Sequence, residues 1–147
     1  SSGAFAHEGN IPSRHTCDGT NVSPPLSISD VPEGAKSLAI IMEDPDVPTT
    51  VRPDGMWDHW VVWNIASDTR EIAENIAPGV IGANTGGKNA YTGPCPPDRE
   101  HRYFFKLFAL DTELALAPGA KKTQLLEAIE GHILTTAELM GRYERKQ

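Results

Sequence analysis

Two side chains that can form hydrogen bonds occur two residues apart in a segment that favours a β-strand. His101 and Tyr103 flank Arg102 in the run His-Arg-Tyr-Phe-Phe. Because residues i and i+2 of a strand project from the same face, the imidazole and the phenol should be neighbours, with Arg102 on the opposite face. Such a pair can bind a polar ligand. Taken alone, the pair is more often a surface His and a core Tyr whose hydroxyl finds one partner.

A second group of candidate side chains lies next to two other apolar segments. Asp44 and Asp46 flank Pro45 directly after one apolar run, and His59 begins another. If both runs are neighbouring strands, two carboxylates and an imidazole gather at one end of a sheet. A carboxylate there would accept the N–H of His59 and direct its other ring nitrogen into a pocket. Alternatively, Asp44 and Asp46 only shape a turn, a common role of Asp beside Pro.

A proline-rich segment, Tyr91-Thr-Gly-Pro-Cys-Pro-Pro97, adds a backbone donor. Gly93 has no side chain to block a ligand and its N–H can donate, whereas prolines have no N–H. With the two imidazoles and the phenol it would form a pocket of donors suited to phosphate, sulfate or carboxylate. An ionised Asp44 would repel such an anion, so it either lies behind His59 or carries a proton.

Three segments have the composition of β-strands and would position these residues. They are residues 38–42, 59–65 and 102–110, which are rich in apolar, β-branched or aromatic side chains. Residues 26–28 and 79–82 are candidates for short edge strands. The strands do not alternate regularly with helices, which favours an antiparallel sheet assembly over a parallel one.

The C-terminal segment has a helical pattern instead. Its apolar residues recur at steps of three and four, the spacing of one helix face: Leu126, Ile129, Ile133, Ala137, Met140 and Tyr143. Thr123 is a candidate N-cap, and Gly131 costs about 1 kcal/mol relative to alanine, so a bend or break is expected there. These features predict a mainly β, α+β protein with helices to one side of the sheets, in a single domain covering residues 1–147.

The composition is that of a globular protein and argues against several classes of partner. Of 147 residues, 39% are hydrophobic and 22% are charged. No apolar run approaches the roughly 18 residues of a membrane helix. The net charge is −7, from 13 Lys and Arg against 20 Asp and Glu, which disfavours nucleic acid as a partner. The N-terminal residues lack the basic start and apolar centre of a signal peptide, so we expect a cytoplasmic protein.

Four short blocks, in this order and spacing, resemble the signature of the phosphatidylethanolamine-binding protein (PEBP) family. They are DPDVP at 44–48, HWVVWN at 59–64, YTGPCPP at 91–97 and HRYFF at 101–105. The stretch TCDGTNVSPPL at 16–26 and the ending LLEAIEGHILTTAELMGRYER resemble the bacterial and archaeal branch of that family. The resemblance covers nearly the whole chain.

The resemblance implies a β-sandwich of antiparallel sheets with a C-terminal helical segment and, at one end, an anion pocket that needs no cofactor. In the family this pocket binds phosphate-like groups, including those of phospholipids. Carried over by motif, it falls on Asp44, Asp46, His59, Gly93, Pro94, His101 and Tyr103. Eukaryotic members inhibit kinases or proteases, so a kinase or protease is an expected partner. Relatives of the prokaryotic type are often dimeric, which makes a homodimer a further expectation.

The two cysteines, Cys17 and Cys95, are too few for a zinc cluster or a disulfide-rich scaffold. The resemblance brings them near each other at the pocket mouth, which leaves open whether they form a disulfide. A reducing cytoplasm would oppose that bond.

The sequence therefore predicts a non-enzymatic binding module for a small anionic or phosphorylated ligand, which regulates or inhibits a partner protein. Two alternatives stay open: a hydrolase with Asp44 or His59 as its acid-base group, and a regulator that acts through its surface. Neither a Gly-x-Ser-x-Gly nor a His-Glu-x-x-His motif is present. Two carboxylates and two imidazoles could ligate a divalent ion, but the resemblance speaks against a required metal.

Overall fold

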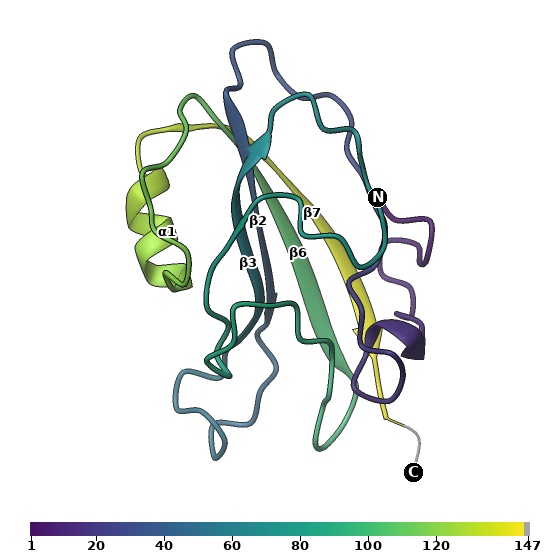
Figure 1. Cartoon of the computed structure of the whole chain (residues 1–147). Helices are drawn as coiled ribbons and strands as arrows, with labels where there is room; N and C mark the ends of the chain where they lie inside the picture. The colour runs from purple at the N-terminus through teal and green to yellow at the C-terminus, as the bar shows by residue number, and fades with distance from the viewer. Residues whose placement is uncertain (146–147) are drawn as a thin grey trace.

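The computed structural model describes residues 1–145, and most of their regular structure is β-strand (Figure 1). The main sheet has five antiparallel strands in the order β5-β3-β2-β6-β7. Its members are β2 (Ser37–Asp44), β3 (Trp57–Ala66), β5 (Val80–Ile81), β6 (His101–Leu110) and β7 (Ile133–Tyr143). A small sheet pairs β1 (Leu26–Ser27) with β4 (Glu71–Ile72), also antiparallel. The helices are η1 (Ser13–His15) and α1 (Lys122–Ile129). The mainly β, antiparallel class predicted from the sequence is confirmed.

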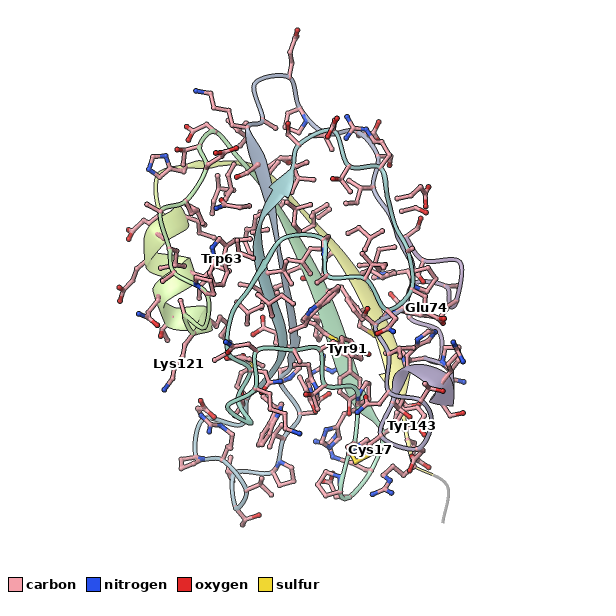
Figure 2. The ribbon with its side chains drawn as sticks, in the orientation of Figure 1. Cys17, Trp63, Glu74, Tyr91, Lys121 and Tyr143 are labelled. Carbon is pink, nitrogen blue, oxygen red and sulfur yellow. A yellow bond between two sulfur atoms is a disulfide. The ribbon has the colours of Figure 1, made fainter. Side chains whose placement is uncertain are left out.

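Both faces of the main sheet are covered, which explains why every residue of β2 is buried. Ile40 projects to the face that packs against the N-terminal segment and the small sheet, through residues such as Ile11 and Ile72. Ile41 projects to the other face, where Leu125 of α1 packs. Figures 1 and 2 show α1 on one side of the sheet, next to Trp63, and the N-terminal segment on the other. No helix in the described chain is long and apolar enough to cross a membrane.

The helix α1 is held to the sheet by charge as well as by packing. Lys122 Nζ lies 2.8 Å from Glu43 Oε2 of β2 and 2.7 Å from Asp58 Oδ1 of β3. The contact with Asp58 is an ion pair without hydrogen-bond geometry. Glu43 is also paired with Lys106 of β6. The two lysines thus neutralise a carboxylate that the sheet buries.

The predicted C-terminal helix is correct only as far as Ile129. Glu130 leaves the helical conformation, Gly131 adopts a left-handed φ of +81°, and residues 133–143 form β7 rather than more helix. The helix N-cap is Lys121, whose N–H donates to Gln124 Oε1, so Thr123 lies in the first turn and is not the cap. The break at Gly131 was expected, but a strand beyond it was not.

Tertiary pairing explains why the helical spacing misled beyond Gly131. The strand β7 pairs with β6 from His101↔Tyr143 to Leu110↔Ile133, so it completes the main sheet. Its first six residues have exposed side chains, and only its second half packs in the core. The apolar residues at steps of three and four therefore do not share one buried face: Ile129 and Met140 are buried, whereas Leu126, Ile133 and Ala137 are exposed. The three long strands and the two short strands named from the sequence are present as β2, β3, β6, β1 and β5, whereas β4 was not predicted.

Candidate functional site

A cavity of about 300 Å³ lies at the end of the main sheet where β2 ends and β3 and β6 begin. The loop between β2 and β3 and the proline-rich segment form its other walls, at the lower end of the view in Figure 1. It is lined by Asp44, Val47, Val51, Trp57, His59, Thr92, Gly93, Cys95, Pro96, Pro97, His101 and Tyr103. Its size is at the lower limit for small-molecule sites. Three remote stretches of chain therefore meet here, as the sequence predicted.

A β-bulge turns His59 into the cavity. The register passes from Met42↔Trp60 to Glu43↔Asp58, which leaves His59 without a residue opposite it on β2. His59 and Trp60 thus both face the side of Tyr103, whereas Asp58 faces Lys122 on the α1 side. Bulges commonly re-aim side chains in this way next to functional sites. Strict strand alternation would have placed His59 on the wrong face.

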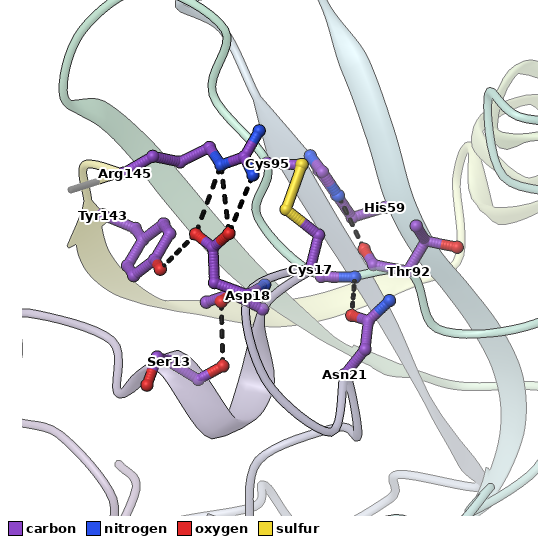
Figure 3. The surroundings of a disulfide bond; sticks show 11 residues. Ser13, Cys17, Asp18, Asn21, His59, Thr92, Cys95, Tyr143 and Arg145 are labelled. Atoms are coloured by element: carbon purple, nitrogen blue, oxygen red, sulfur yellow. Dashed lines mark hydrogen bonds and ion pairs between the residues drawn. A yellow bond between two sulfur atoms is a disulfide. The ribbon is translucent and has the colours of Figure 1, made fainter. Parts of the chain in front are cut away.

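The His59 ring is oriented by a backbone carbonyl. Its Nδ1 lies 2.6 Å from the Thr92 carbonyl oxygen, and Figure 3 shows this bond beside the disulfide. A carbonyl only accepts, so Nδ1 carries the hydrogen and Nε2 of the neutral ring keeps a lone pair. Burial lowers the pKa of His59, although the Thr92 hydrogen bond and the Asp44 charge oppose that shift. The expectation that a carboxylate would orient this ring is wrong.

His101 is held between two carboxylates. Its Nδ1 lies 2.6 Å from Asp44 Oδ2, and its Nε2 lies 2.6 Å from Asp98 Oδ1. Ionised carboxylates only accept, so an imidazolium that donates at both nitrogens satisfies both contacts. Asp44 therefore lies behind His101, not behind His59, and its Oδ1 also accepts the Asp46 N–H at 2.7 Å. Neither ring nitrogen of His101 is free for a ligand in this arrangement.

Tyr103 supplies a buried hydroxyl to the site. Its ring packs edge-on to His59, with centroids 5.3 Å apart, and stacks on His101 at 6.3 Å. The residue is fully buried, and within residues 1–145 no acceptor meets hydrogen-bond geometry with its hydroxyl, although Asp44 lies close enough to act on it. Burial and the nearby Asp44 charge raise the pKa of Tyr103, so the hydroxyl keeps its proton. A buried hydroxyl without a partner is costly, which makes it a candidate contact for a ligand.

Three residues predicted to bind the ligand form hydrogen bonds within the protein instead. Asp46 accepts the Arg102 backbone N–H and pairs with the Arg102 guanidinium, which lowers the pKa of Asp46. Pro94 does not line the cavity, and its carbonyl accepts the Cys17 N–H. The Gly93 N–H donates to Asn21 Oδ1 at 2.8 Å and is therefore not free for an anion.

The role of Gly93 is also different from the predicted one. A Cβ at this position would clash with the His15 carbonyl oxygen, Asn21 Oδ1 and the Thr16 backbone. Gly93 therefore lets the proline-rich segment approach residues 15–21 closely, rather than letting a ligand approach the backbone.

A disulfide fastens the same two segments together. Cys17 and Cys95 are bonded, which decides a pairing that the sequence left open, and Cys95 lines the cavity (Figure 3). On the other side of Cys17, Asp18 accepts hydrogen bonds from Tyr143 and Arg145 at the end of β7. The pocket wall is thus tied through the disulfide to both the N-terminal segment and the main sheet. The cellular compartment stays a prediction.

Sequence reasoning missed the apolar part of the cavity. Val47, Val51 and Trp57 come from the β2–β3 loop and the start of β3, and Pro96 and Pro97 face them from the proline-rich segment. Four of them lie within three residues of a predicted site residue, and that proximity was the signal available; Val51 lies five residues beyond Asp46. Among the described residues, no group of three or more His, Cys, Asp and Glu side chains is arranged to hold a metal ion.

Comparison with known proteins places this chain and its fold in a family. The family model described as phosphatidylethanolamine-binding protein matches residues 1–144. The chain belongs to the phosphatidylethanolamine-binding protein family. Two UPF0098 proteins are similar to this chain over nearly its whole length. The protein of Chlamydia muridarum is 53% identical, and the alignment covers 97% of this chain and 95% of that protein. The protein of Methanothermobacter thermautotrophicus is 52% identical with the same coverage.

Solved structures agree with this assignment. A putative PEBP homologue from Chlamydia trachomatis, CT736, superposes with a TM-score of 0.97 at 51% identity, covering 99% of this chain and 96% of that chain. E. coli YbcL, described as a member of the mammalian PEBP family, gives a TM-score of 0.89 at 30% identity, covering 99% and 97%. The predicted membership of the PEBP family is confirmed.

Proposed function

We propose that this PEBP-family protein is a binding module for a small ligand in which a phosphate or similar anionic group is joined to an apolar part. The observation that carries the proposal is the Tyr103 hydroxyl, which is buried without a partner in a cavity whose other walls are largely apolar. A ligand oxygen would accept the hydrogen bond that this hydroxyl lacks. The family's name, which refers to a phospholipid, is consistent with such a ligand.

The protonation of His59 makes anion binding conditional. The neutral ring offers a lone pair at Nε2, which repels an anionic oxygen, whereas the protonated ring donates there. Binding of an anion would therefore be accompanied by uptake of a proton at His59. Alternatively, a ligand that carries its own hydroxyl proton would donate to Nε2.

The apolar walls argue for more than an isolated ion. Trp57, Val47 and Pro97 would contact a hydrocarbon or aromatic part of the ligand, and apolar burial contributes roughly 25 cal/mol per Å². A headgroup with a short apolar extension fits this division into a polar floor and apolar sides.

We infer that the module does not turn its ligand over. Among the described pocket residues, the Cys95 thiol is consumed in a disulfide, and the one side-chain bond of the Thr92 hydroxyl is to the Asn84 amide, which is not a general base. The lone pair of His59 Nε2 is the one observation that favours the alternative, a hydrolase in which His59 activates water. A turnover assay on phosphate and carboxylate esters separates the binding module from the hydrolase. Hydrolysis that wild type catalyses and His59→Ala does not would refute the proposal of binding alone.

Binding itself is tested by NMR titration with phosphate and phosphoethanolamine. We expect the side-chain signals of His59 and Tyr103 to shift at millimolar ligand. Tyr103→Phe should weaken binding by about tenfold to a hundredfold, the value of one hydrogen bond to a charged group. Tyr143→Phe removes a hydroxyl outside the cavity and serves as the matched control. If neither His59 nor Tyr103 responds, the pocket is not an anion site.

A partner protein and a homodimer stay predictions. A kinase or protease target would be identified by inhibition assays with and without a pocket-filling His59→Trp variant, which separates action through the pocket from action through the surface. Sedimentation at increasing concentration would report a homodimer.

A further inference from the structure

Asp98 is a carboxylate that follows the pocket wall directly and reaches back to a pocket residue. It comes just after Pro96 and Pro97, and its Oδ1 lies 2.6 Å from Nε2 of His101. The Asp98 side chain is 40% exposed, whereas His101 is completely buried. An exposed acidic side chain thus covers the second nitrogen of a buried imidazole.

The two carboxylates on His101 are held very differently. Asp44 is 3% exposed, and its other oxygen accepts the Asp46 N–H, so it is fixed by the fold. Asp98 lies on an exposed stretch, and within residues 1–145 the cation near its second oxygen is the Arg99 guanidinium, whose Nε is 3.8 Å away. Asp44 is therefore a permanent partner of His101, and Asp98 is the partner that can be exchanged.

We propose that Asp98 acts as an internal anion that occupies the His101 Nε2 donor until a ligand anion replaces it, and so decides which anions the pocket accepts. This rests on the anion-binding function proposed above and names the missing donor. The Gly93 N–H and the His101 Nδ1 are committed within the protein. Displacement of Asp98 would release one charge-assisted donor from a buried imidazolium.

A tethered competitor discriminates between ligands. Because Asp98 is three residues from His101, its effective concentration at Nε2 is in the millimolar range or above. A simple carboxylate such as acetate offers the same chemistry without the tether and should be excluded. A phosphate dianion has more charge and a third oxygen, so it can contact His101 Nε2 and the Tyr103 hydroxyl together. Asp98 thus selects ligands by their charge and by the number of their acceptor oxygens.

The test compares wild type with Asp98→Asn in titrations with inorganic phosphate and with acetate. Asparagine keeps an oxygen that accepts from Nε2 but removes the charge. We expect Asp98→Asn to bind phosphate about tenfold more tightly and to gain measurable acetate binding. Glu100→Gln removes an exposed charge two residues away and should change neither affinity. Equal or weaker phosphate binding in Asp98→Asn would overturn the proposal.

A measurement on the unaltered protein makes the result independent of the variant's folding. With ¹³C-labelled aspartate, phosphate should shift the Asp98 carboxyl signal in wild type. The Asp44 carboxyl signal should not shift, because Asp44 stays bonded to His101. An Asp98 signal that does not move while Tyr103 responds refutes the exchange and leaves the binding function intact. If neither wild type nor Asp98→Asn responds to phosphate, the binding function fails together with this inference.

Discussion

Anion binding to this protein should weaken steeply as the pH rises, because His59 must gain a proton to donate. His59 is 5% exposed, its Nδ1 hydrogen is committed to Thr92, and burial lowers its pKa below 6.5. A bound anion beside Nε2 would raise that pKa again. Between the free and the bound pKa, each pH unit should weaken binding by up to about tenfold, which is one proton or about 1.4 kcal/mol.

The assay is isothermal titration with sulfate, whose charge does not change over the range from pH 5 to 8. Buffers of different ionisation enthalpy would report the uptake of one proton directly. In His59→Asn, whose amide can replace Nδ1 as donor to Thr92, the slope should disappear. Asp98 should not contribute to the slope, because its hydrogen bond to His101 lowers its pKa in spite of the desolvation that raises it. A sulfate affinity that does not change with pH in wild type would refute the coupling.

The same group predicts a trend in stability of the unliganded protein. The pKa of His59 is lower in the folded than in the unfolded chain, so the unfolded chain binds more protons below about pH 6.5. The free energy of unfolding should be unaffected by His59 above that pH. It should fall by up to about 1.4 kcal/mol per pH unit as the pH drops from 6.5 towards the folded pKa. Urea melts of wild type and His59→Asn would isolate the contribution, and parallel pH curves for the two proteins would contradict it.

Three further predictions concern the scaffold around the site. Gly93→Ala should lower stability by about 2 to 3 kcal/mol, because the new Cβ overlaps backbone atoms; Gly3→Ala, in open space, is the control for the urea melts. Reduction of the disulfide, whose cysteines are 78 residues apart, should lower the free energy of unfolding by roughly 4 kcal/mol, and identical melts with and without reductant would contradict this. Lys122→Met removes the cation that pairs with Glu43 and Asp58 and should lower the free energy of unfolding by about 2 kcal/mol in thermal melts. Lys121→Met, at an exposed position, is the control and should lower it by less than about 0.5 kcal/mol.

The fold class could be predicted from the sequence because the composition of each long central strand indicates a strand without reference to the rest of the chain. The run 38–42 is apolar and buried on both sides, and 59–65 and 102–110 have the β-branched and aromatic residues that fit a pleated surface. The segment after Gly131 was not accessible, because residues 133–143 become a strand by pairing with β6, a partner more than 20 residues away. Pairing across that distance overrides a local helical spacing.

The chemical inventory of the site was also set by the sequence, whereas the use of each group was decided by tertiary structure. The amino-acid order fixed that His59, His101 and Tyr103 would be available near the ends of strands. Only the folded chain decided that a bulge turns His59 inward, that Asn21 takes the Gly93 N–H, and that Asp98 covers His101. The physical reason is that hydrogen bonds saturate. A donor listed by type is available to a ligand only if no other part of the chain reaches it first, and which part reaches it depends on contacts between residues far apart in sequence.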